Sequence, residues 1–322
     1  LRALQDARVS ADSRFDERGI DERLGRVEPV ADVLLDSRGH RRMPRETKTA
    51  ALSFRQQHSP SDIRHTLGEM EPVRRIEHEY RVRFDEADAD GWLRPSGLMR
   101  YAQDMAWRHS TEAGFDRAWY LARGMNWLVR NARVSLLEPI TYGDVLAIST
   151  QVNGWRHVWA RRHTEVRRVG SEDGRGDDGL MATVDTDWVL LVDDGRPARA
   201  PQEVADYFSP GTKFARDRIQ LPAPAVEPTR LSTRVRPLDL DPMRHMNNAA
   251  YVDMVDDGIG RLPPDQRVEG LDCYRIGYVL PALPGTPIEI ASWPVSETQV
   301  ACRISTADGT ELTKALVSRS SE

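Results

Sequence analysis

Four polar side chains with complementary chemistry lie close together in the second half of the chain. Asp241, His245, Asn247 and Asn248 fall within the eleven residues that end at Tyr251. An imidazole can take or give a proton near neutral pH, and a nearby carboxylate can orient it. Unpaired N–H groups at a helix start can stabilise an oxyanion. This combination suits acyl transfer; the same residues are also compatible with a simple turn, capped by its Asp and Asn side chains, with an exposed His.

This polar stretch lies between an extended segment and a helix. Apolar Leu231, Val235 and Leu238 indicate a strand before it. The spacing of the apolar residues after it predicts a helix from about Met246 to Leu262. We therefore expect His245 at the start of that helix.

The scaffold of this stretch occurs a second time, 153 residues earlier in the chain. Asp88 corresponds to Asp241, but Trp92 takes the place of His245, and the two amide positions hold Arg94-Pro95. A further set of matches has an offset of 142 residues: Arg133, Pro139, Gly143 and Ile148 correspond to Arg275, Pro281, Gly285 and Ile290. The offsets differ by eleven, which predicts a shorter connection between helix and strands in the second half.

Each half has one amphipathic helix followed by several strands. The first helix is predicted at about Ser96 to Gly114, as the counterpart of the helix after His245. Alternating apolar positions predict strands at 145–152, 158–166, 183–192, 288–292 and 299–305. A lone helix followed by consecutive antiparallel strands favours an α+β fold, in which the sheet wraps the helix, over a parallel βαβ fold.

Composition limits the partners and the organisation of the chain. With 322 residues it has room for two domains, and its net charge of −5 disfavours nucleic acid. No apolar run reaches about 18 residues, so no membrane span is expected. Cys273 and Cys302 are too few for a disulfide framework and lack metal-ligand spacing, and Gly-rich phosphate loops are absent. We expect a cytoplasmic protein without metal or cofactor.

Residues 1–69 differ from the rest because they contain no Trp or Tyr and could hardly build a core. We expect them to be a disordered or non-native extension, with the functional protein starting near Met70. A Gly/Asp-rich insert at 170–179 is expected to be an exposed hairpin loop. The predicted segments are this extension, a first domain (70–196), a Pro-rich linker (197–228) and a second domain (229–322).

These residues resemble the acyl-acyl-carrier-protein thioesterases, a family with two tandem hot-dog domains. The most specific match runs from Asp241 to Tyr251, Asp-Pro-Met-Arg-His-Met-Asn-Asn-Ala-Ala-Tyr, and is similar to the family's Asp-x-Asn-x-His-Val-Asn-Asn-x-x-Tyr. Supporting matches are the helix 98–114, Asn126-Trp127-Leu128-Val129, Tyr142-Gly143-Asp144 and 199–204. The resemblance covers roughly residues 76–318 and implies two tandem hot-dog domains, each a long helix wrapped by an antiparallel sheet.

The resemblance also implies a reaction, the hydrolysis of a fatty acyl thioester of acyl carrier protein or CoA by water. It makes His245 the general base or a positioned hydrogen-bond donor and gives Asp241 the role of holding it. It implies that the first half lines the acyl pocket. The substrate-binding residues implied in this way are Asn247, Asn248, Tyr251, Trp92 and Met99.

The sequence departs from the family pattern at three positions. Met243 stands where the family has a catalytic-loop Asn, and Gly277 and Tyr278 stand where it has an acidic residue and a thiol. Asp257 matches a family carboxylate on the helix and is a candidate substitute base; the alternative is a solvated helix charge.

Other clusters leave two readings open. Arg161, Arg162 and Arg167 form part of an arginine-rich strand that is either a solvated face or a docking surface for an acidic carrier protein or the CoA phosphates. An aromatic set is expected to form core and pocket wall: Trp107, Trp119, Tyr120 and Trp127.

Two other functions compete with hydrolysis. An enoyl-thioester hydratase also uses tandem hot-dog domains with an Asp/His pair, and a non-catalytic acyl-binding protein would tolerate Met243 and Gly277. The chain is expected to be a monomer or a homodimer, and the sequence specifies neither the acyl length nor the carrier.

Overall fold

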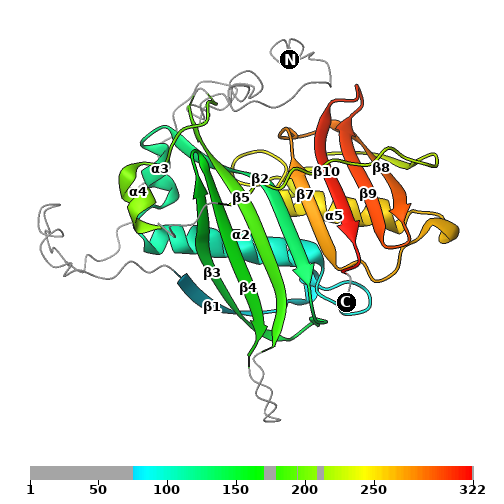
Figure 1. The fold of residues 1–322 in the computed structure, drawn as a ribbon, viewed down its shortest axis with the longest axis horizontal. Coiled ribbons are helices and arrows are strands. Elements are labelled where there is room, and N and C mark those ends of the chain that lie inside the picture. The colour runs from blue at the N-terminus through cyan, green and yellow to red at the C-terminus, as the bar shows by residue number, and fades with distance from the viewer. Residues whose placement is uncertain (1–74, 170–178, 194, 209–213, 321–322) are drawn as a thin grey trace, which may run out of the picture.

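A computed structural model describes residues 75–169, 179–193, 195–208 and 214–320 (Figure 1). The predicted extension 1–69 and nearly all of the predicted loop 170–179 lie outside the described residues. Within these ranges, no helix is long and apolar enough to cross a membrane.

One ten-stranded antiparallel sheet runs through both halves of the protein, in the order β1-β3-β4-β5-β2-β7-β10-β9-β8-β6. The first half contributes β1 (Arg75–Arg81), β2 (Met125–Leu136), β3 (Val145–Arg156), β4 (Trp159–Arg168) and β5 (Leu180–Val192). The second half contributes β6 (Thr229–Arg234), β7 (Cys273–Tyr278), β8 (Pro287–Ser296), β9 (Gln299–Thr306) and β10 (Glu311–Ser318). The two halves join where β2 pairs with β7.

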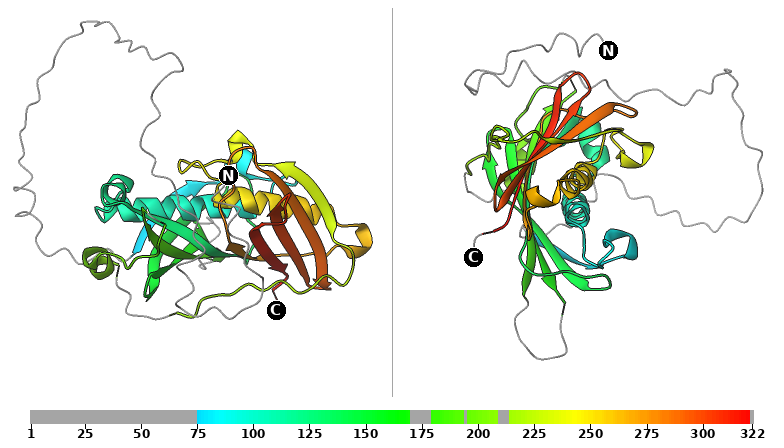
Figure 2. Two further views of the ribbon diagram at one scale, coloured as in Figure 1. Left: turned by 90° about the horizontal axis from the view of Figure 1, so that it is seen from above. Right: turned by 90° about the vertical axis from the view of Figure 1, so that its right-hand side faces the viewer.

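Two long helices, α2 (Pro95–Glu112) and α5 (Asn248–Gly260), lie side by side on the same face of the curved sheet (Figure 2). Short helices are α3 (Arg117–Leu121) and α4 (Gln202–Tyr207), with 3₁₀ turns η3 (Phe84–Glu86), η4 (Pro237–Asp239) and η5 (Pro264–Gln266). One long helix per half against an antiparallel sheet confirms the predicted α+β fold.

Buried and more exposed residues alternate along the strands, so the two faces of the sheet have different side chains. On β4, Ala160, Arg162, Thr164 and Val166 are buried, whereas the residues between them are more exposed. Successive side chains of a strand point to opposite faces, so one set faces α2 and the other faces away from it. Helix α2 buries the complementary side, including Met105 and others at helical spacing.

The repeat seen in the sequence is also a repeat of backbone contacts. The N–H of Arg94 donates to Glu86 O at 3.0 Å, and the N–H of Asn247 donates to Asp239 O at 2.7 Å, which reproduces the offset of 153. At the offset of 142, Gly143 donates to Val82 O in the first half and Gly285 to Val235 O in the second. The second connection is shorter, as predicted, because α5 has 13 residues against 18 in α2 and is followed by η5 where the first half has α3.

The linker between the halves packs against the face of the sheet opposite to the helices. After α4, Ile219 and Leu221 pack with Trp293 of β8. The Trp293 indole N–H donates to Pro222 O at 3.2 Å, and Asp217 forms an ion pair with Arg275 of β7. The linker therefore fastens the two halves of the sheet along their outer side.

Candidate active site

The polar stretch folds into a tight turn directly before α5. The Asp241 carboxylate accepts the Met243 N–H at 2.8 Å, and the Asp241 N–H donates to the carbonyl oxygen of His245 at 2.9 Å. Arg244 has a left-handed φ of 62°, at the position where the first copy has Gly91 with a φ of 87°. Asp241 therefore fixes His245 through the backbone of the turn.

Asp241 acts on the His245 side chain through its negative charge and not through a hydrogen bond. Among the hydrogen bonds of the described residues, none joins the carboxylate to the imidazole. Burial lowers the pKa of His245 below its usual 6.5, and the negative charge of Asp241 partly offsets this. The imidazole is consequently neutral at pH 7 and able to accept a proton.

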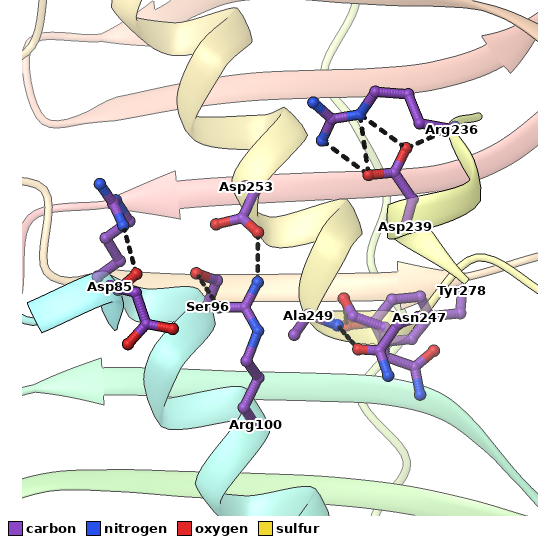
Figure 3. A network of polar contacts seen from close by, with 11 residues as sticks. Asp85, Ser96, Arg100, Arg236, Asp239, Asn247, Ala249, Asp253 and Tyr278 are labelled. Atoms are coloured by element: carbon purple, nitrogen blue, oxygen red, sulfur yellow. Dashed lines mark hydrogen bonds and ion pairs between the residues drawn. The ribbon is translucent and has the colours of Figure 1, made fainter. Parts of the chain in front are cut away.

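The start of α5 differs from the prediction by two residues. Met246 is extended: it forms a bridge with Leu240 and donates its N–H to Ala282 O at 3.0 Å. Asn247 is the N-cap, and its side-chain oxygen accepts the Ala249 N–H at 2.8 Å (Figure 3). The helix therefore begins at Asn248, because the first of the two amides provides the cap.

At the start of α5, the backbone N–H of Asn248 has no hydrogen-bond acceptor among the described residues. The N–H groups of Ala249 and Ala250 bond to the side chain and carbonyl of Asn247, whereas the described residues provide no acceptor for the Asn248 N–H. Tyr278 of β7 supports the site from below, since its hydroxyl donates to the Asn248 carbonyl at 3.1 Å. The Asn248 N–H is thus a candidate donor to an oxyanion.

Residues of the first half contact the turn, and sequence reasoning missed both of them. Arg117 of α3 donates to the Pro242 carbonyl at 3.4 Å and approaches the Met243 sulfur at 3.7 Å. The side-chain amide of Asn126, on β2, lies 3.8 Å from the same sulfur. An amide from the other half thus lies beside Met243, the residue that replaces the family Asn.

A cavity in the first half lies between α2 and the sheet. It has about 50 Å³ of room for the centres of water-sized molecules, and it is partly open to solvent. Three members of the predicted aromatic set, Trp107, Tyr120 and Trp127, line it, whereas Trp119 packs against Tyr120. The other lining residues are Ala106, Ser110, Val152, Trp155, Ala160, Arg162, Trp188, Val204 and Phe208. Tyr120 and Trp127 belong to α3 and β2, the same elements that contact the turn.

Several residues predicted to bind substrate lie elsewhere. Trp92 is 44% exposed and pairs through its backbone with Thr141, and Met99 is fully buried in the main core. Neither lines the cavity, because the apolar wall comes from the later turns of α2 and from the sheet. Tyr251 is buried, and its hydroxyl oxygen accepts the Ala282 N–H at 3.1 Å, which is a structural contact.

The candidate substitute base, Asp257, lies on the solvent side of α5, and its catalytic role stays a prediction. Asp257 is exposed and paired with Arg261 at 3.2 Å, as expected for a solvated helix charge. Its neighbour Asp256 faces the sheet and accepts the Tyr274 hydroxyl hydrogen bond at 2.8 Å. Burial raises the pKa of Asp256 to about 7. The perturbed carboxyl of α5 is therefore Asp256.

The arginines predicted to dock a carrier divide between the two faces of β4. Arg162 is 7% exposed and lines the cavity, so its assignment to a docking surface is wrong. Arg161 and Arg167 face outward and pair with Asp187 and Glu165. Their role in docking stays a prediction.

The two long helices meet through equivalent positions of the repeat. Arg100 of α2 pairs with Asp253 of α5 at 2.6 Å, and these residues are 153 positions apart (Figure 3). The same guanidinium also donates to Ser96 at 2.9 Å. The pseudo-twofold axis that relates the halves therefore passes close to this ion pair.

Sequence profiles match both halves of the chain. The profile described as acyl-ACP thioesterase N-terminal domain matches residues 74–208, and the one described as acyl-ACP thioesterase C-terminal domain matches residues 223–317. No curated protein matches this chain in sequence.

Solved structures share the same architecture. An acyl-ACP thioesterase from Bacteroides thetaiotaomicron is 16% identical, with a TM-score of 0.63 over 77% of this chain and 99% of that one. A 12:0-ACP thioesterase from Umbellularia californica is also 16% identical, with a TM-score of 0.63 over 76% of this chain and 96% of that one. The predicted pair of tandem hot-dog domains is confirmed.

Proposed function

The chain belongs to the acyl-ACP thioesterase family and is a thioester hydrolase, and from this premise we propose that the turn at His245 activates the water that attacks a fatty acyl thioester of acyl carrier protein. One observation carries the proposal. The turn that holds His245 contacts α3 and β2 of the first half, and these two elements also form part of the aromatic cavity wall. An acyl chain bound in that cavity would contact two elements that also touch the turn.

The reaction needs one proton carrier and one oxyanion donor. Neutral His245 takes a proton from water as the water oxygen attacks the carbonyl carbon. The negative charge then develops on the former carbonyl oxygen, where the free N–H of Asn248 can donate to it. When the carbon–sulfur bond breaks, the imidazolium returns its proton to the leaving thiolate, so that a free acid and a thiol are the products.

Asp241 and Asn126 act on this chemistry indirectly. The charge of Asp241 stabilises the imidazolium that forms during the reaction, while its hydrogen bond to Met243 keeps the turn in shape. Since the thioether of Met243 is a weak hydrogen-bond partner, the Asn126 amide beside it is the better group to orient the water.

The test is thiol release from long-chain acyl carrier protein and acyl-CoA, followed with a thiol reagent. We expect His245→Ala to lower kcat by about 100-fold or more, the usual contribution of a general base. Arg261→Ala, on the exposed end of the same helix, is the control and should retain activity. Hydration of an enoyl thioester without thiol release would favour the hydratase alternative. Tight binding without either reaction would leave an acyl-binding protein.

A further inference from the structure

The cavity in the first half contains a buried cation. Arg162 extends from β4 on the face that packs against α2, and only 7% of it is exposed. The remaining wall is largely aromatic, with Trp107, Trp127, Trp155 and Trp188 among the lining residues. A pocket meant only for a hydrocarbon chain has no use for a guanidinium at this depth, because burying a charge is costly.

Among the described residues, only one of the three guanidinium nitrogens of Arg162 has a hydrogen-bond acceptor. Its Nη1 donates to His109 Nδ1 at 2.9 Å and lies 3.4 Å from the Thr150 hydroxyl. In the described part of the chain, Nε and Nη2 have no acceptor and no carboxylate pairs with the side chain. Its neighbour Arg161, on the opposite face, has a bidentate contact with Asp187. On β4, the outward-facing Arg161 thus has a carboxylate partner, whereas the cavity-facing Arg162 has none among the described residues.

Arg162 remains charged under ordinary conditions. Burial lowers its pKa to about 10, and the nearby Tyr120 opposes this shift. At pH 7 the protonated form still dominates by about a thousandfold. His109 accepts from Arg162 through Nδ1, so its ring is neutral and supplies no negative charge. Because the described residues supply no negative charge to Arg162, the cavity offers a place for an anion or a strong acceptor from water or from a ligand.

We propose that the cavity selects acyl chains that carry an oxygen acceptor distant from the thioester, a carboxylate before a hydroxyl, and that Arg162 is the residue that reads it. This inference rests on the proposed function, since it describes the substrate of the same site. A methyl-ended chain that reached Arg162 would displace water and leave Nε and Nη2 of the guanidinium without an acceptor, since only Nη1 is bonded by His109 and Thr150. A carboxylate would instead accept from the two unpaired nitrogens, an arrangement that is common for Arg.

Binding can be measured without hydrolysis. The probes are S-alkyl pantetheine thioethers of stepped chain length that end in methyl, hydroxyl or carboxylate, titrated by tryptophan fluorescence. Pantetheine is common to both carriers, so the choice of carrier does not affect the comparison. At the preferred length we expect the carboxylate probe to bind about 10- to 100-fold more tightly than the methyl probe, the range for a hydrogen bond to a charged group.

Two variants assign the selectivity to Arg162. Arg162→Met keeps an unbranched side chain but removes the charge and the N–H donors, and should reverse the preference toward the methyl probe. Arg162→Lys keeps the charge and should retain part of the preference for carboxylate. Arg303→Met, on the exposed part of β9, is the matched control and should leave the ratio unchanged. Equal or tighter binding of the methyl probe by the wild type at every length overturns the inference, whether or not the variants fold.

Thiol release from the corresponding thioesters separates this inference from the proposed function. Selective binding without any thiol release would refute hydrolysis at His245 but retain the role of Arg162. Hydrolysis that prefers methyl-ended chains, with the same preference in Arg162→Met, would refute the role of Arg162 but retain the hydrolase.

Discussion

Replacing Asp256 by Asn should stabilise the protein at alkaline pH and have much less effect at acidic pH. Asp256 lies between α5 and β7, where burial raises its pKa from 3.8 to about 7. A carboxyl with a raised pKa binds its proton more tightly in the folded state. The folded state is therefore progressively penalised as the pH rises from about 4 to about 7, and the full penalty remains above that window.

The size of the effect follows from the two pKa values. A raised pKa of about 7 against 3.8 corresponds to about 4 kcal/mol once the group is ionised, and to about 2 kcal/mol at pH 5, where only the unfolded state has lost its proton. An amide has no charge in either state, and its oxygen can still accept the Tyr274 hydroxyl hydrogen bond. The advantage of Asp256→Asn should thus grow by roughly 2 to 3 kcal/mol between pH 5 and pH 8.

Urea unfolding of both proteins at the two pH values, followed by circular dichroism, measures this difference directly. Asp257→Asn is the control, because this exposed carboxylate has only a surface ion pair with Arg261 and its replacement should change stability by less than about 1 kcal/mol at either pH. An advantage of Asp256→Asn that is the same at pH 5 and pH 8 would show that the carboxyl is not neutral in the folded protein.

Three further outcomes test the site. The rate of thiol release should rise with pH through a value below 6.5, because His245 must lose its proton and its pKa is lowered; a pH–rate profile that is flat from pH 5 to 8 contradicts this. Arg244→Gly should raise the free energy of unfolding by up to about 1 kcal/mol with little change in rate, since it relieves a left-handed φ; thermal unfolding and the hydrolysis assay check both. Met243→Asn should increase kcat by providing a stronger group beside Asn126 to hold the water, and an unchanged or lower kcat argues against that role.

The fold could be predicted from the sequence because its main signals are local and occur twice. Asp88 and Asp241 mark the same turn, and the strand alternation places β3, β4 and β5 within a few residues of their observed bounds. The start of α5 was predicted two residues too early, at Met246. The sequence does not show that the backbone of Met246 is held extended by contacts with Leu240 and Ala282.

The site was harder to predict because it depends on how the two halves meet. Nothing in the sequence around Asn126 indicates that its amide lies beside Met243, over a hundred positions away. The burial of Arg162, in contrast, could have been found. It lies an even number of residues from the apolar Ala160 and Val166, and side chains at this spacing share one face of a strand. This pattern places Arg162 on the inner face of β4.

The pairing of Arg100 with Asp253 shows what joining two copies in one polypeptide makes possible. In a symmetric dimer of identical chains, a residue on the twofold axis meets itself, so an arginine would confront an arginine. Such a clash survives where Arg133 and Arg275 oppose each other across β2 and β7, and it is relieved by Asp217 from the linker. Arg100 and Asp253 carry opposite charges at equivalent positions, and Asp217 comes from a linker that has no counterpart in the other half. Both arrangements need two copies with different sequences. The same freedom allows one copy to hold His245 where the other has Trp92.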